Sequence, residues 1–120
     1  MRKEDIESME RLRKVGIDTE MGLKRVANKE YLYLKLLKSL VNGTLYQALE
    51  IAVSSGCPEK ILAAAHAIKG VCAHLAIGEL QQQAGEIERH ARNKELAEVE
   101  ECFRQFSVTY KKVAAVIKSM

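Results

Sequence analysis

The feature that most constrains the fold is a run of apolar residues near the carboxyl end, spaced alternately by three and four positions. It lies within residues 95–118 and consists of Leu96, Val99, Phe103, Phe106, Tyr110, Val113 and Ile117. This spacing places the side chains on one face of a long α-helix. Asn93 is the expected N-cap, and Glu95 is expected in the first turn, where the helix dipole favours an acid.

A second helical segment extends over residues 29–55. Its apolar face is formed by Leu34, Leu37, Val41, Leu45, Ala48 and Ala52. Asn28 is the expected cap at its start. Asn42 and Gly43 interrupt the pattern, so the sequence predicts that the helix is kinked or split there.

The sharpest boundary in the chain is the run Ser55, Gly56, Cys57, Pro58. Glycine suits the left-handed residue after a helix, and proline suits the first turn of the next, so a new helix is expected from about Pro58. Its inward face is Ile61, Ala64, Ala65, Ile68, Cys72 and Leu75. Gly78 then precedes a shorter helix with Leu80, Ala84, Ile87 and Ala91 inward.

Amphipathic helices joined by short connections must bury their apolar faces against one another, and short loops make sequential helices antiparallel. This argument also favours a bundle core over a coiled coil for the 96–117 seam. Ahead of the helices, GIDTEMGLKRV indicates a loop, an Asp18 cap and one or two helical turns. We therefore predict an all-α, up-and-down four-helix bundle with a short N-terminal helical cap. Residues 1–120 form a single domain, with the bundle core at about 29–118.

Composition excludes several classes of protein. The 19 Lys and Arg against 16 Asp and Glu give a net charge of +3, too low for a dedicated nucleic-acid binder. Cys57, Cys72 and Cys102 are widely spaced and form no CxxC, which indicates small core residues rather than a disulfide framework or zinc site. No apolar run approaches the ~20 residues of a membrane span, and no signal peptide is indicated. We expect a soluble cytoplasmic protein, or a soluble piece of a larger one.

The stretch AAHAIKGVCAH, residues 64–74, carries the candidate chemistry. At roughly 100° per residue, His66 lies roughly 180° from Leu75 on the helix, so it points away from the core. Lys69 shares its face at i+3. A glycine inside a helix, such as Gly70, destabilises it by roughly 1 kcal/mol relative to alanine. A glycine is nevertheless useful at this position if its missing side chain gives a partner access to the His66 ring. The alternative interpretations of His66 are a histidine buried in the core or a surface histidine without a function.

An imidazole is largely uncharged at neutral pH, keeps a lone pair and can form covalent intermediates. A phosphoryl group on its nitrogen would be a natural anion for Lys69. The chain has no GxxxxGK[ST], no GxGxxG and no obvious carboxylate pair for magnesium. The phosphoryl donor and any metal must therefore come from another protein, and we expect neither a cofactor nor a metal site in this chain.

The run AHAIKGVCAHLAIGEL resembles the signature of histidine phosphotransfer (HPt) domains, AHxLKGxxxxLG. GIDTEMGLKRVANKEYLYLKLL is similar to their N-terminal pattern, and the resemblance covers residues 15 to about 115. It implies a four-helix bundle whose exposed histidine takes a phosphoryl group from a receiver-domain aspartate and passes it to another. It also implies that His66 is the phosphorylated residue, Lys69 the lysine near the phosphoryl group, and Gly70 the small residue beside the ring.

Three positions depart from the family pattern. Ala76 stands where the family usually has glycine, His74 where asparagine is frequent, and Val71 where a small or hydroxyl residue is common. The HxxKG core is intact, so these departures affect details of the phosphoryl contacts and the turn into the next helix.

The resemblance implies a phosphocarrier without its own ATP-dependent kinase activity. Its expected partners are response-regulator receiver domains and a hybrid sensor kinase, with no nucleic acid and no membrane, and we expect a monomer. Docking should be transient, through a modest interface. The candidate docking residues are Ala63, Ala67, Ala73, His74 and Arg92.

Other functions remain open as alternatives. A helical adaptor could bind a signalling partner through the same surface with no phosphoryl chemistry. The basic amino terminus could bind nucleic acid, although acidic residues interrupt it. A hydrolase or metalloenzyme is disfavoured because no second catalytic group accompanies the histidine.

Overall fold

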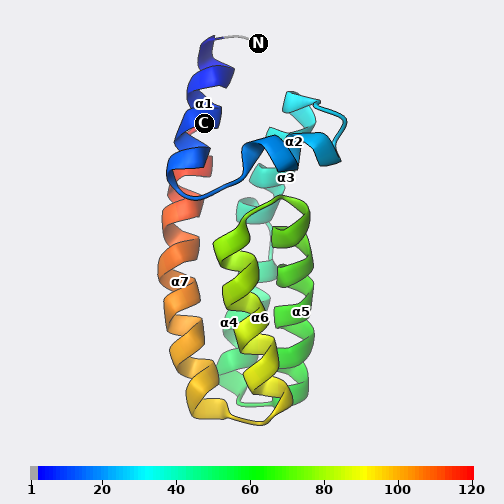
Figure 1. Cartoon of the computed structure of the whole chain (residues 1–120). Helices are drawn as coiled ribbons and strands as arrows, with labels where there is room; N and C mark the ends of the chain where they lie inside the picture. The colour runs from blue at the N-terminus through cyan, green and yellow to red at the C-terminus, as the bar shows by residue number, and fades with distance from the viewer. Residues whose placement is uncertain (1–2) are drawn as a thin grey trace.

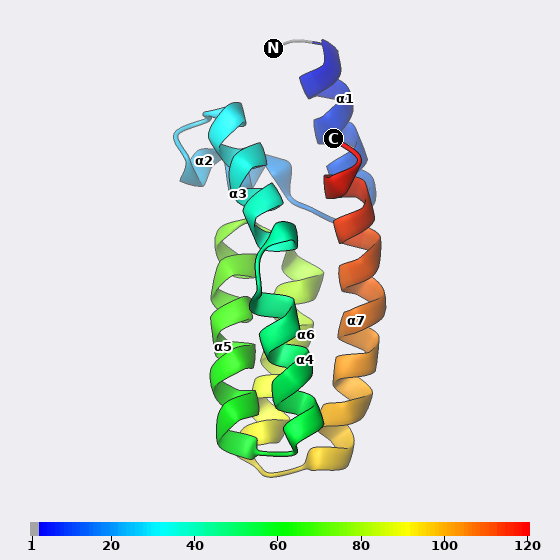
Figure 2. The same cartoon turned by 180° about the vertical axis from the view of Figure 1, so that it is seen from behind.

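The computed structural model describes residues 3–120, which are helical throughout apart from short connections. In chain order the helices are α1 (Lys3–Lys14), α2 (Thr19–Arg25), α3 (Glu30–Asn42), α4 (Leu45–Ser55), α5 (Pro58–His74), α6 (Gly78–Arg92) and α7 (Leu96–Lys118). Helices α4 to α7 run side by side as an up-and-down bundle (Figures 1 and 2). Helix α3 precedes α4 and extends beyond it, and α1 and α2 lie at the same end of the bundle as α3. The predicted four-helix bundle with an N-terminal helical cap is confirmed.

The second segment is split rather than kinked, which is one of the two predicted outcomes. Asn42 ends α3, and Gly43 has an extended backbone with φ −88° and ψ −165°. The prediction that Ala48 faces inward was wrong: Ala48 is exposed, whereas Leu49 is fully buried. Because the break resets the helical phase, the face of α3 does not continue along α4.

Two predicted N-caps were wrong. The N-cap residues are Lys29 for α3 and Glu95 for α7. Asn28 has a left-handed φ of 59°, and Asn93 is instead the C-cap of α6. Asparagine tolerates the turn conformations that follow a helix as well as the cap position, so residue type alone did not separate the two.

Other boundary predictions are confirmed. Asp18 caps α2, because its Oδ1 accepts a hydrogen bond from the Met21 backbone N–H at 3.1 Å. Gly56 takes a left-handed φ of 66° after α4, and Pro58 opens α5. These signals succeed because a local backbone requirement determines the residue type.

Tyr33 connects the N-terminal cap to the bundle. Its ring is fully buried, and its hydroxyl donates to the Leu75 carbonyl at the end of α5, at 2.7 Å. Burial raises the pKa of Tyr33 to about 12, so the hydroxyl stays protonated and remains a donor. Gly22 of α2 packs directly on this ring, and a Cβ there would overlap the tyrosine hydroxyl. The end of α5 is therefore held by α2 and α3.

The apolar seam of α7 supplies one wall of the core. Val99, Phe106, Tyr110, Val113 and Ile117 are buried, and Leu96 and Phe103 are partly buried against the same cluster. Tyr46 of α4 stacks on the α7 aromatic rings, with its centroid 4.4 Å from that of Tyr110. Within residues 3–120, no helix is both long enough and apolar enough to cross a membrane.

Candidate functional site

Helix α5 positions His66 by burying its opposite face. Ile61, Ala65, Ile68 and Cys72 are completely buried, so the helix cannot rotate without exposing apolar side chains. The His66 side chain is consequently 73% exposed, on the side that the helical spacing predicted. The ring is accessible to another macromolecule and is not enclosed in a pocket.

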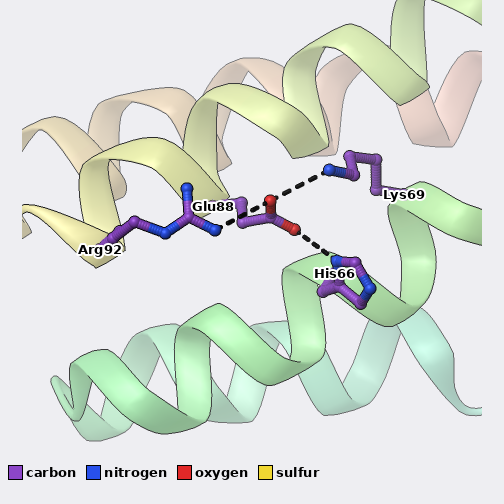
Figure 3. A network of polar contacts seen from close by, with 4 residues as sticks. All are labelled: His66, Lys69, Glu88 and Arg92. Carbon is purple, nitrogen blue, oxygen red and sulfur yellow. Dashed lines mark hydrogen bonds and ion pairs between the residues drawn. The ribbon is translucent and has the colours of Figure 1, made fainter.

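A buried carboxylate of α6 holds this exposed ring. Nδ1 of His66 lies 2.9 Å from Oε2 of Glu88. Lys69 donates to the other oxygen, Oε1, at 3.0 Å, and Arg92 contacts the same oxygen at 3.4 Å (Figure 3). The Glu88 side chain is only 8% exposed. The site is therefore a carboxylate at the α5–α6 interface, surrounded by three nitrogen donors.

The electrostatics of Glu88 determine which ring nitrogen carries the proton. Burial by itself would raise the pKa of this carboxyl, but the hydrogen bonds and charges of Lys69 and His66 outweigh burial and lower the pKa below its ordinary value. An ionised carboxylate can only accept hydrogen bonds. Nδ1 of His66 must therefore carry a proton, and in the neutral ring the lone pair is on Nε2, on the side away from Glu88.

The surface around His66 consists of small residues. A Cβ at Gly70 would have no neighbouring atom within 4 Å outside its own helix backbone. Ala63 and Ala67 are exposed, and Ala73 is partly buried. The ring consequently projects from a low ridge to which a partner has open access.

A shallow apolar groove of ≈560 Å³ lies beside this ridge, between α4 and α5. It is lined by Ala48, Ile51, Ala52, Lys60, Ala63 and Ala64. Ile51 is 69% exposed in it, which is unusual for a large aliphatic side chain. Ala63 lies one helical turn before His66, so the groove is continuous with the ridge.

The structure brings some of the predicted site residues together and separates others. Lys69 and Arg92 join His66 through Glu88, whereas His74 is exposed at the end of α5 and outside this network. His90 lies at the end of α6, where its Nδ1 pairs with Glu95 at 3.0 Å. Among the residues described, no group of three or more His, Cys, Asp or Glu is arranged to hold a metal ion.

Sequence reasoning missed Glu88, and one signal could have revealed it. The inward face of α6 is formed by Leu80, Ala84, Ile87 and Ala91, all buried. Glu88 adjoins Ile87 and lies one turn after Ala84, so it is a charged residue on an otherwise apolar face. A charge at such a position requires a partner from another element.

A protein-family model described as the Hpt domain matches residues 42–117. The matched span includes α4, α5 and α6 and nearly all of α7, and with them His66, Lys69, Glu88 and Arg92. Neither the curated proteins nor the solved structures contain a match to the chain.

Proposed function

Because this chain belongs to the Hpt domain family, whose function is histidine phosphotransfer in phosphorelays, we propose that it carries a phosphoryl group between receiver-domain aspartates on His66. The observation that carries the proposal is an exposed imidazole whose Nδ1 is held at 2.9 Å by a buried, ionised carboxylate. This contact leaves Nε2 with its lone pair on the accessible side. An Hpt domain is a phosphocarrier rather than a kinase domain, so the phosphoryl group comes from the partner.

The transfer begins on the partner's aspartyl phosphate. The Nε2 lone pair of His66 attacks phosphorus, the P–O bond to the aspartate breaks, and its electron pair stays on the aspartate carboxylate. The new N–P bond leaves the ring as an imidazolium, with the proton still on Nδ1. Glu88 stabilises that positive charge, and Lys69 offsets the negative charge of the phosphoryl group. Transfer to a second receiver reverses each step and returns a neutral ring.

The partners in this proposal are receiver domains, with a hybrid sensor kinase as the source of the first phosphoryl group. We propose that a receiver docks over Ala63, Ala67 and Ala73, and that an apolar side chain of the receiver covers Ile51 in the neighbouring groove. We include His74 and Arg92, which are both exposed, in the proposed docking surface. Such a carrier works where receiver domains are, so the proposal includes a cytoplasmic location.

We also propose that residues 1–120 act as one domain. The hydrogen bond from Tyr33 to Leu75 and the packing of Gly22 support this, because they fasten α2 and α3 to the end of α5. Removing α2 would therefore uncover the Tyr33 ring that holds the end of the helix carrying His66.

The deciding experiment is incubation with a phosphorylated receiver domain, followed by measurement of acid-labile phosphate on the chain. Wild type and a His90→Gln control should take up label, because His90 pairs with Glu95 at the end of α6 and is not a candidate docking residue. His66→Gln should take up none. Label that passes equally well to His66→Gln would eliminate the proposal. The alternative, a helical adaptor, predicts no uptake by wild type and a partner affinity that His66→Gln does not change.

A further inference from the structure

One oxygen of Glu88 has two cationic partners. Oε1 accepts from Nζ of Lys69 at 3.0 Å and contacts Nη2 of Arg92 at 3.4 Å, while Oε2 contacts His66. Lys69 is the closer and more buried of the two cations, with a side chain 31% exposed against 61% for Arg92. In the unphosphorylated protein, Lys69 is the main counter-ion of Glu88, and Arg92 is a looser second one.

Phosphorylation changes this balance. A phosphoryl group on Nε2 would bring about two negative charges next to Lys69, which shares a helical face with His66. If Lys69 turns towards that group, Oε1 loses its closer partner. A carboxylate that is 8% exposed is destabilised when it loses its counter-ion, and a protonated Glu88 would no longer stabilise the imidazolium of His66.

We propose, resting on the function proposed above, that Arg92 is a reserve counter-ion: when the phosphoryl group draws Lys69 away, Arg92 replaces it at Oε1 of Glu88. Glu88 then stays ionised and continues to accept the Nδ1 proton of the phosphorylated ring. Arg92 is thus a positioning residue that acts through Glu88, and it does not touch the phosphoryl group.

The geometry suits Arg92 to this exchange. Arg92 follows Glu88 by four residues on α6, so both side chains project from adjacent turns of the same face (Figure 3). Its guanidinium offers five donors and stays charged, and the 3.4 Å contact can shorten without moving the backbone. Lys69 can turn away because its side chain is partly exposed, and its stem passes over Gly85, which has no side chain to hold it in place.

A double-mutant cycle in the unphosphorylated protein tests the exchange. Lys69→Met removes the first counter-ion while keeping an unbranched stem, and Arg92→Met removes the second with little change in helix propensity. We expect Arg92→Met to raise the unfolding equilibrium constant, measured by urea denaturation, about three- to fivefold more in the Lys69→Met background than in wild type. Strictly additive effects would show that Arg92 does not replace Lys69.

Phosphorylation itself provides the second arm. His66 is phosphorylated with phosphoramidate, which needs no partner protein, and Arg104→Met serves as a matched control because Arg104 pairs with the exposed Glu101. We expect Arg92→Met to raise the unfolding constant about three- to fivefold relative to this control only in the phosphorylated protein. An equal effect in both forms, or none in either, would overturn the proposal. A chain that accepts no phosphoryl group on His66 would instead contradict the proposed function, while the unphosphorylated cycle would still report whether Arg92 can replace Lys69.

Discussion

Replacing Glu88 with leucine separates the role of this residue in phosphotransfer from any role in folding. The side chain lies on the apolar face of α6, where leucine has a suitable size and polarity. Its partners His66, Lys69 and Arg92 all remain partly exposed, so they can turn to water when the carboxylate is lost. No buried charge is left behind, and we expect the free energy of unfolding to change by less than about 1 kcal/mol.

The expected effect on phosphotransfer is larger. Glu88→Leu removes the acceptor that keeps the proton on Nδ1 and stabilises the imidazolium. A hydrogen bond to a charged group contributes about 1.5–3 kcal/mol, and the lower end applies because water reaches a ring that is 73% exposed. A loss of about 1.5 kcal/mol corresponds to a phosphorylation rate about tenfold slower.

The assay is the initial rate of His66 phosphorylation by phosphoramidate, with urea denaturation of the same samples. Glu100→Leu is the control, since it removes one carboxylate from an exposed position on α7. A Glu88→Leu protein that is folded and phosphorylated as fast as wild type would refute the reasoning that this carboxylate prepares the ring.

Three further predictions concern access, acid stability and packing. Gly70→Leu should remain folded by circular dichroism, because a Cβ at this position meets no neighbouring side chain. It should nevertheless slow phosphoryl transfer from a receiver. An unfolded variant would mean that the glycine serves packing. Because the pKa of Glu88 is lowered on folding, the unfolded chain binds more protons between the two pKa values. Urea titrations at several pH values should therefore show that the free energy of unfolding falls as the pH drops below about 4.5, and that it falls less in Glu88→Leu. The same pH dependence in wild type and Glu88→Leu would contradict this. Gly22→Ala should destabilise by about 2 kcal/mol in urea denaturation, since its Cβ displaces Tyr33 and its bond to Leu75; unchanged stability would show that the ring can move freely.

The parts of the fold that follow from local chemistry were predictable from the sequence. The alternating spacing of α7, the Asp18 cap and the Gly56–Pro58 boundary each reflect a requirement of the chain within a turn or two. The break at Gly43 was visible, but the burial of Leu49 in place of Ala48 was not, because the rotation across a break depends on how α4 packs against its neighbours.

The residues of the candidate site on α5 were predictable from the sequence, whereas the prediction missed the contacts that α6 makes with them. The exposure of His66 and its proximity to Lys69 follow from helical geometry. The contact with Glu88 does not, because it depends on how α5 and α6 are placed against each other. Arg92 was predicted as a candidate docking residue, and its position beside Glu88 became visible once that contact was known.

The atom of His66 that accepts the phosphoryl group is the most direct test of the account. Phosphoramidate-treated protein labelled with ¹⁵N in histidine can be examined by ¹⁵N and ³¹P NMR, which distinguishes the two ring nitrogens. The account predicts phosphorus bonded to Nε2, with Nδ1 still protonated. Phosphorus on Nδ1, or a His66 ring that stays unmodified while another residue carries the phosphoryl group, would contradict it.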